Sequence, residues 1–109
     1  MEPSSKPPRP YETFKRQFPA VNEAYESLGR ACHNTGPLSP KARELVKIGM
    51  SMGAGLESAT HAHVRLAREA GASPEEIRHA AVLATTTLGY PSMMRGMAWV
   101  NDVLDAPEE

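Results

Sequence analysis

Two histidines stand two residues apart in the stretch GLESATHAHVRLAREAG, Gly55 to Gly71. The spacing of its apolar residues predicts one helix, in which two residues turn the chain by about 200°. His61 and His63 therefore cannot point the same way. Histidine exchanges a proton near neutral pH more readily than other side chains, so proton transfer is the chemistry that either ring could supply.

A helical wheel separates the two rings. His63 falls among apolar residues and is predicted to face the interior, whereas His61 falls among charged residues and is predicted to face solvent. An inward His63 is either a structural histidine bonded to a buried partner, or a general acid or base in a pocket of small side chains. The residues that share its face are Leu56, Ala59, Leu66, Ala67 and Ala70.

No metal site and no cofactor is expected. The rings of a His-x-His pair diverge on a helix and cannot share a zinc ion. The single cysteine, Cys32, excludes a multi-cysteine metal cage. The segment GMSMGAG lacks the lysine and the spacing of a phosphate-binding loop, which excludes nucleotide binding.

The other candidate site residues are Glu44, Tyr90, Arg95 and Trp99. Glu44 lies at the edge of an apolar arc, where an exposed pair with Lys47 at spacing i, i+3 is one interpretation. The two aromatic side chains could line a substrate pocket through their polar tips. Arg95 could hold a carboxylate substrate, and it is equally compatible with a solvent-facing position.

Helices must position these residues, because no segment shows the alternation typical of a strand. Two helix starts are well marked: Ser39 precedes Pro40, and SPEE at Ser73–Glu76 is a capping box. Gly71 and the Gly89–Pro91 break are natural helix stops. The prediction is an all-α, compact bundle of about five or six helices.

Two apolar patterns predict packing surfaces. A stripe from Val21 to Cys32 is typical of a core-facing helix, which makes Cys32 a packed residue rather than a reactive one. The helix from Ile77 to Leu88 is apolar on more than one side, as expected at a bundle centre or a subunit contact. Residues 1–10 contain four prolines and are predicted to be a flexible tail, and residues 11–106 a single helical domain.

Composition limits the classes of partner. The 12 basic and 13 acidic residues nearly cancel, so no nucleic-acid partner is expected. No apolar run is long enough to span a bilayer, so no membrane partner is expected. Because one cysteine cannot form an intrachain disulfide, the reducing cytoplasm is the predicted location. A chain of 109 residues is near the lower limit of comfortable core building, which favours burial of further surface against sister subunits.

Three motifs occur together between Leu38 and Gly96: the Arg-Glu-Leu helix start that contains Glu44, the run H-x-x-x-A-x-x-x-G-x-S-x-E-E-I from His63 to Ile77, and the Gly-Tyr-Pro break. With them the chain resembles the core of the carboxymuconolactone decarboxylase family, which includes the alkylhydroperoxidase D-like proteins. The resemblance implies a compact helical fold that assembles into homotrimers or homohexamers, with sites at or near subunit contacts.

The peroxidase branch of that family uses a Cys-x-x-Cys pair, a histidine four residues later and a glutamate on the preceding helix. The resemblance assigns the histidine to His63 and the glutamate to Glu44, whereas the cysteine positions hold Leu56 and Ala59. Peroxide reduction by that route needs an attacking and a resolving thiol. Thiol peroxidase activity is therefore not expected.

The decarboxylase branch also lacks the cysteine pair and keeps the histidine. The resemblance to it implies cofactor-free acid–base chemistry on a small organic acid or lactone, with His63 transferring the proton and Glu44 in contact with it as the orienting group. This chain departs from that branch at Ala59, where those proteins carry a glutamate. The alternative is a non-catalytic oligomeric binding or scaffold protein in which His63 is a structural remnant.

Overall fold

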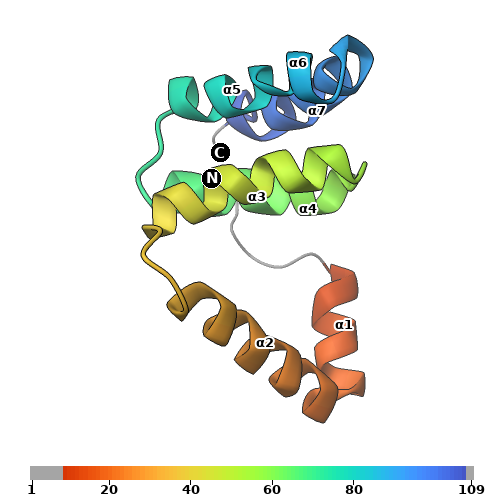
Figure 1. The fold of residues 1–109 in the computed structure, drawn as a ribbon. Helices are drawn as coiled ribbons and strands as arrows, with labels where there is room; N and C mark the ends of the chain where they lie inside the picture. The colour runs from red at the N-terminus through yellow and green to blue at the C-terminus, as the bar shows by residue number, and fades with distance from the viewer. Residues whose placement is uncertain (1–8, 108–109) are drawn as a thin grey trace. The chain divides into compact units, whose positions relative to one another are not determined.

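The computed structural model describes residues 9–107, which form seven helices and no strand (Figure 1). The all-α prediction is confirmed. The described residues hold one helix more than the upper expectation of six, because the segment predicted as a single helix from Ile77 to Leu88 is interrupted at Leu83. The helices are α1 (Arg9–Gln17), α2 (Pro19–Asn34), α3 (Pro40–Gly53), α4 (Glu57–Glu69), α5 (Pro74–Val82), α6 (Ala84–Thr87) and α7 (Tyr90–Leu104).

The described residues fall into two units, one ending at Leu38 and the other beginning at Ser39. In the first unit, the hydroxyl of Tyr11 on α1 donates a 2.7 Å hydrogen bond to Oε2 of Glu26 on α2. This bond lowers the pKa of Glu26 and raises the pKa of Tyr11, because it stabilises the carboxylate and the neutral phenol. Helix α1 begins at Arg9, inside the predicted tail, and residues 1–8 of that prediction lie outside the described residues.

The apolar stripe of α2 is exposed, which corrects the prediction that it faces a core. Val21, Tyr25 and Leu28 are 58%, 69% and 61% exposed, and Cys32 is exposed as well. The prediction that Cys32 is packed is therefore wrong. Two helices that meet along one seam cannot cover a wide stripe, and Asn22 is the one buried residue among those described in this unit.

In the unit from Ser39 onward, α3 and α4 lie side by side in one layer, and α5, α6 and α7 pack on it as a second layer (Figure 1). A turn of three residues joins α3 to α4, so the two helices run antiparallel. The core between the layers is apolar. Its buried members are Ile48, Met52, Val64, Ala67, Ala72, Ile77, Ala81, Ala84, Met93, Val100 and Val103.

Helix α7 approaches α3 closely at Gly96, which is buried. A Cβ atom at Gly96 would lie 2.7 Å from Cγ of Met52 and closer still to its Cε. Met52 is fully buried, so its side chain occupies the space that any larger residue at position 96 would need.

The predicted helix starts and stops are confirmed. Ser39 accepts a 3.1 Å hydrogen bond from the backbone of Ala42, and Pro40 is the first residue of α3. Gly71 follows α4 with a φ angle of 97°, and Gly89 precedes α7 with a φ angle of 101°. Both angles lie in a region that favours glycine. Each of these helix ends thus has a cause in the residues next to it: a serine side chain and a proline at the start of α3, and a glycine with positive φ at the other two.

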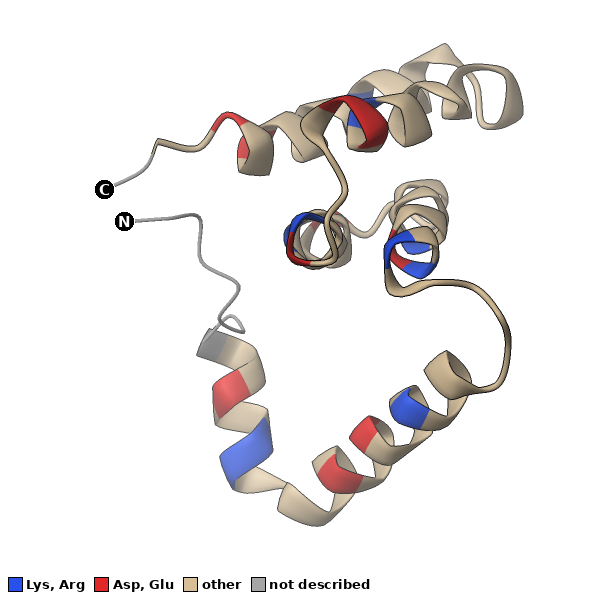
Figure 2. Cartoon of the chain, turned by 90° about the vertical axis from the view of Figure 1, so that its left-hand side faces the viewer, with Lys and Arg blue, Asp and Glu red and all other residues tan. Residues whose placement is uncertain are grey.

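Acidic and basic residues lie on the same helices rather than gathering on one of them (Figure 2). This arrangement agrees with the near-cancellation of charge in the sequence. Among the described residues, no helix combines the length and the hydropathy that crossing a bilayer requires.

The capping box of α5 predicts a pH dependence of stability. Ser73 N donates to Oε1 of Glu76 at 2.9 Å, and Glu76 N donates to Oγ of Ser73 at 3.0 Å. The pKa of Glu76 is lowered first by the backbone N–H of Ser73 and then by Lys41, whose Nζ lies 3.1 Å from Oε2. A lowered carboxyl pKa contributes stability that is present above the ordinary value of 4.5 and is lost as the pH falls through the folded-state pKa.

We therefore expect Glu76→Gln to lower the free energy of unfolding at neutral pH and to flatten its decline in acid. Denaturant unfolding at several pH values below 6 measures both effects. Glu75→Gln is the matched control, because Glu75 is also exposed and takes no part in the capping box. The same acid dependence in both variants would contradict the assignment.

Candidate functional site

A hydrogen bond joins His63 on α4 to Glu44 on α3, with 2.8 Å between Nδ1 and Oε1. The contact that the family resemblance implies is therefore present. An ionised carboxylate can only accept a hydrogen bond, so Nδ1 carries the hydrogen, and in the neutral imidazole Nε2 keeps its lone pair. Glu44 is 7% exposed, and the interpretation of it as a solvent-facing residue is wrong.

The two partners differ in their access to water. The side chain of Glu44 is 9% exposed to solvent, and the side chain of His63 is 24% exposed. A carboxylate that is largely removed from water interacts more strongly with a neighbouring imidazolium than an exposed one would. The imidazole of His63 remains reachable from solvent, which a proton-transfer group requires.

A second polar contact fixes the seam between α3 and α4. The hydroxyl oxygens of Ser51 and Thr60 lie 3.0 Å apart, and both residues are buried. Ser51 also lies within hydrogen-bond distance of the carbonyl of Ile48, and Thr60 within that of Leu56, so both hydroxyls are satisfied. This contact holds the two helices in the register that sets Glu44 opposite His63.

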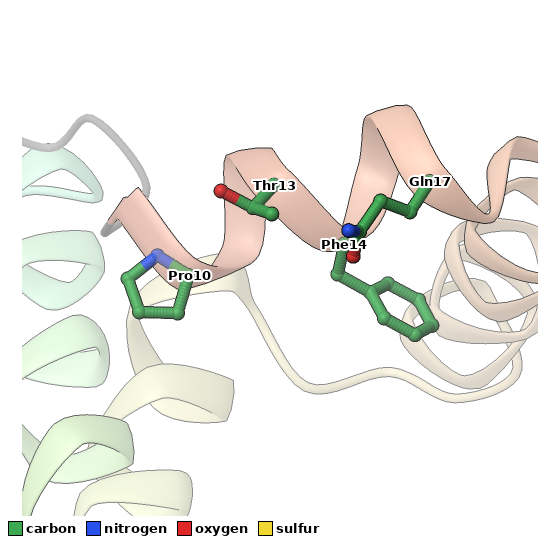
Figure 3. Close-up of a pocket in the computed structure, with 4 residues that line it drawn as sticks. All are labelled: Pro10, Thr13, Phe14 and Gln17. Atoms are coloured by element: carbon green, nitrogen blue, oxygen red, sulfur yellow. The ribbon is translucent and has the colours of Figure 1, made fainter.

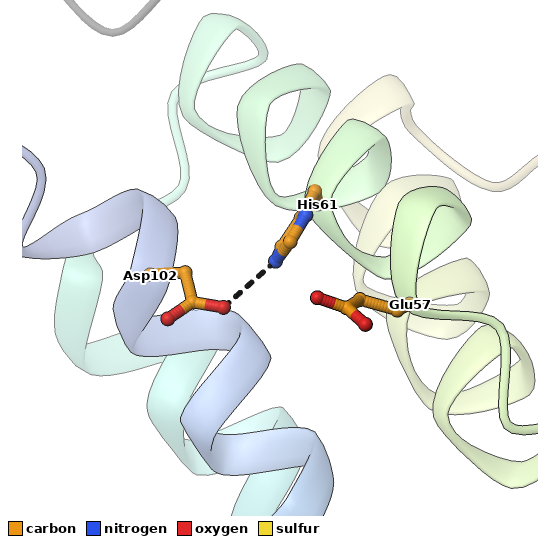
Figure 4. Close-up of side chains that lie close together, drawn as sticks. All are labelled: Glu57, His61 and Asp102. Carbon is orange, nitrogen blue, oxygen red and sulfur yellow. Dashed lines mark hydrogen bonds and ion pairs between the residues drawn. The ribbon is translucent and has the colours of Figure 1, made fainter.

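His61 does not face solvent, which corrects the prediction from the helical wheel. Its Nε2 lies 2.9 Å from Oδ2 of Asp102 on α7, and its side chain keeps 22% of its exposure (Figure 4). The ring therefore lies between α4 and α7, at the opposite side of α4 from His63.

The buried face of α4 explains both histidines. Its buried residues are Thr60, Val64 and Ala67. At 100° per residue, the centre of this arc lies about 65° from His63 on one side and about 95° from His61 on the other. Each ring thus lies at one edge of the buried face, and each reaches a carboxylate on a different neighbouring helix.

The prediction that His63 faces the interior depends in part on Leu56 and Leu66, which share its face, being core residues. They are 52% and 40% exposed. Of the five apolar residues on the face of His63, Ala67 is fully buried. The predicted inward face is thus only partly covered within this chain.

Helix α7 carries the three residues predicted to bind substrate. The guanidinium carbon of Arg95 lies 5.2 Å from the centre of the Trp99 ring, in a cation–π contact, and Tyr90 is 61% exposed. Arg95 and Trp99 share a face of α7 with Asp102, at spacing i, i+4, i+7. Within the described residues, no hydrogen bond, ion pair or ring contact joins the three to the His63–Glu44 pair.

Glu57 and Asp102 are polar residues near His61 that the sequence analysis did not single out. Together with His61 they place three possible metal-ligand atoms within 4.8 Å of one another. The i, i+4 spacing of Glu57 and His61 was a usable signal, because it sets two side chains on one helix face. Asp102 carried no such signal, since its role depends on how α7 packs against α4.

A hollow along α1 is lined by Pro10, Thr13, Phe14 and Gln17 (Figure 3). None of these side chains ionises near neutral pH, so the hollow supplies no acid–base group. The hollow is therefore not a candidate site for proton-transfer chemistry.

The model of the carboxymuconolactone decarboxylase family matches residues 19–102. This span contains Glu44 and His63, and it extends the resemblance seen between Leu38 and Gly96 to include α2 and most of α7. The chain matches no curated protein, and it matches no solved structure.

Proposed function

Because the chain belongs to the carboxymuconolactone decarboxylase family, we propose that it is a cofactor-free acid–base enzyme that acts on a small organic acid or lactone in the cytoplasm. The observation that supports this proposal is the 2.8 Å hydrogen bond between Glu44 and His63, with the imidazole still open to solvent. His63 is the proposed proton-transfer residue, and Glu44 is its positioning residue.

The proposed mechanism uses the two ring nitrogens of His63 differently. Glu44 accepts the hydrogen of Nδ1, which fixes the tautomer and leaves Nε2 as the basic atom. When Nε2 takes up a proton, the carboxylate of Glu44 stabilises the imidazolium. In a decarboxylation, the bond between carbon and the departing CO₂ breaks, its electron pair stays on the substrate, and the imidazolium donates its Nε2 proton to that carbon. The neutral ring then takes up a proton from water.

A thiol peroxidase mechanism forms no part of this proposal. The chain has one cysteine, and it lies on α2, before the helices that carry the site. Leu56 and Ala59 stand where the peroxidase branch has its two thiols. Neither residue can attack a peroxide or form a disulfide.

The proposed assembly is a homo-oligomer, a trimer or a hexamer. Large apolar side chains are exposed on several helices of the unit from Ser39 onward, and a contact between copies would cover them. Tyr90, Arg95 and Trp99 are the residues proposed to bind substrate, at a contact between copies. The exposed apolar side chains of this unit include Val46, Met50, Leu56, Leu66, Val82, Leu83, Leu88 and Met94.

Size-exclusion chromatography with light scattering tests the assembly. We expect a species of three or six chains of 11.8 kDa at micromolar concentration. A stable monomer under these conditions would refute the oligomer, and it would leave the exposed apolar residues without cover.

A ligand screen tests the function. Small carboxylates and lactones are screened by thermal shift and by NMR against the wild type, His63→Ala and His79→Ala. His79 is exposed on α5 and serves as the matched histidine control. We expect a ligand that raises the Tm of the wild type and of the His79 variant, shifts the His63 ring signals and has no effect on His63→Ala.

A different outcome would support the scaffold alternative. In that case no compound in a broad panel binds, and His63→Ala only loses stability. His63 would then serve as a structural link between α3 and α4.

A further inference from the structure

We propose that Glu57, His61 and Asp102 form a binding site for a divalent first-row transition-metal ion between α4 and α7. The site is separate from the His63–Glu44 pair and does not depend on the function proposed above. Figure 4 shows the three side chains converging from α4 and α7.

The distance between His61 and Asp102 fits a shared ion. Two ligand atoms that each lie about 2.1 Å from a metal are about 3.0 Å apart at right angles and about 3.4 Å apart at the tetrahedral angle that Zn²⁺ favours. Nε2 of His61 and Oδ2 of Asp102 are 2.9 Å apart. An ion can therefore replace the hydrogen between them if the two side chains move apart by at most about 0.5 Å.

Glu57 supplies the third ligand atom. It precedes His61 by one helical turn on the same face of α4, and its carboxylate lies within 4.8 Å of the other two ligand atoms. No hydrogen bond joins Glu57 to His61 or Asp102. Because its side chain is exposed, it can close the remaining gap by rotating about its own bonds.

The charges of the group favour a cation. Two carboxylates flank one imidazole, so the cluster carries negative charge whether or not the ring is protonated. A divalent ion neutralises both carboxylates at once. A set of one imidazole nitrogen and two carboxylate oxygens suits Zn²⁺ and its first-row neighbours better than Mg²⁺ or Ca²⁺, which prefer oxygen alone. Water would complete the coordination, since Glu57 and Asp102 are both exposed.

A bound ion would join α4 to α7, two helices of opposite layers. Binding to the folded state alone raises stability in proportion to the logarithm of the ratio of ion concentration to Kd. The site therefore has a readout that is independent of any enzymatic activity.

Isothermal titration of the chelator-treated full chain with ZnCl₂ tests the proposal. We expect one Zn²⁺ per chain, weaker binding of Mg²⁺, and a Tm that rises with added Zn²⁺. His61→Ala and Asp102→Asn should each weaken Zn²⁺ binding by more than about tenfold, or roughly 1.4 kcal/mol. Asp102→Asn can still accept a hydrogen bond from His61 and is the variant least disturbing to the fold.

Two matched controls locate the ion. His79→Ala and His63→Ala each remove a histidine outside the cluster, so both should bind Zn²⁺ as the wild type does. Circular dichroism confirms that each variant retains its helices. Absence of Zn²⁺ binding to the wild type, or equal affinity in the wild type and in His61→Ala and Asp102→Asn, would overturn the proposal.

Discussion

Replacing His63 by glutamine is expected to lower kcat by about 10²–10⁴-fold, the contribution that a positioned general acid or base typically makes. Glutamine can still donate a hydrogen bond to Glu44, but it has no basic nitrogen. The measurement is steady-state kinetics on a substrate of the class that the ligand screen identifies. His79→Gln should keep the wild-type kcat, since His79 is exposed on α5.

The partner of His63 should show a smaller and different effect. Glu44→Gln keeps an oxygen that accepts the Nδ1 hydrogen, but it removes the charge that stabilises the imidazolium. We expect a lower kcat with little change in KM, together with a displaced pH–rate profile. A purely structural role for Glu44 would leave that profile in place. Wild-type kcat in a folded His63→Gln protein would refute the proposed role of His63.

The largest effect on stability is expected at Gly96. An alanine there would bring its Cβ within 2.7 Å of Cγ of the buried Met52, and overpacking of this kind costs about 1–3 kcal/mol. The preference of helices for alanine over glycine offsets about 1 kcal/mol of this cost. We therefore expect Gly96→Ala to lower the free energy of unfolding by about 0–2 kcal/mol.

Gly49→Ala is the matched control for this prediction. Gly49 also lies inside a helix, and a Cβ there would meet no atom within 4 Å. The same substitution should raise the free energy of unfolding by about 0.5–1 kcal/mol at this position. Urea unfolding of both variants gives the comparison. Equal stability of the two variants would mean that Met52 moves aside at no cost.

Several features of the fold could be predicted because their causes are local. A serine followed by proline, or by proline and two glutamates, satisfies the free backbone N–H groups at a helix start without help from other elements. Glycines with positive φ end helices for a similarly local reason. The starts at Ser39 and Ser73 and the stop at Gly71 therefore match the structure.

The features that could not be predicted depend on which neighbour covers which face. The stripe of α2 has the pattern of a core helix, yet α1 alone covers it within its unit, and Tyr25 stays 69% exposed. The predicted buried face of α4 was centred on the wrong residues, because Leu56 and Leu66 are apolar without being buried. Asp102 lies beside His61 because α7 packs against α4. The residues next to His61 in the sequence give no indication of that packing.

The contact between Glu44 and His63 stands between these cases. The residues alone favour an exposed pair between Glu44 and Lys47, and only the resemblance to a family pointed to His63. The structure shows the physical reason for the pairing: the antiparallel hairpin of α3 and α4 is held in register by Ser51 and Thr60, which fixes Glu44 opposite His63.

The two histidine links also restrain the rotation of α4 about its own axis. Because His63 and His61 lie at opposite edges of the buried face, a turn in either direction stretches one hydrogen bond and compresses the other. Two polar contacts thus restrain the rotation of the helix from both sides, in addition to the packing of its buried residues. A change at one histidine should therefore alter the NMR signals of the other ring, although the two side chains share no partner.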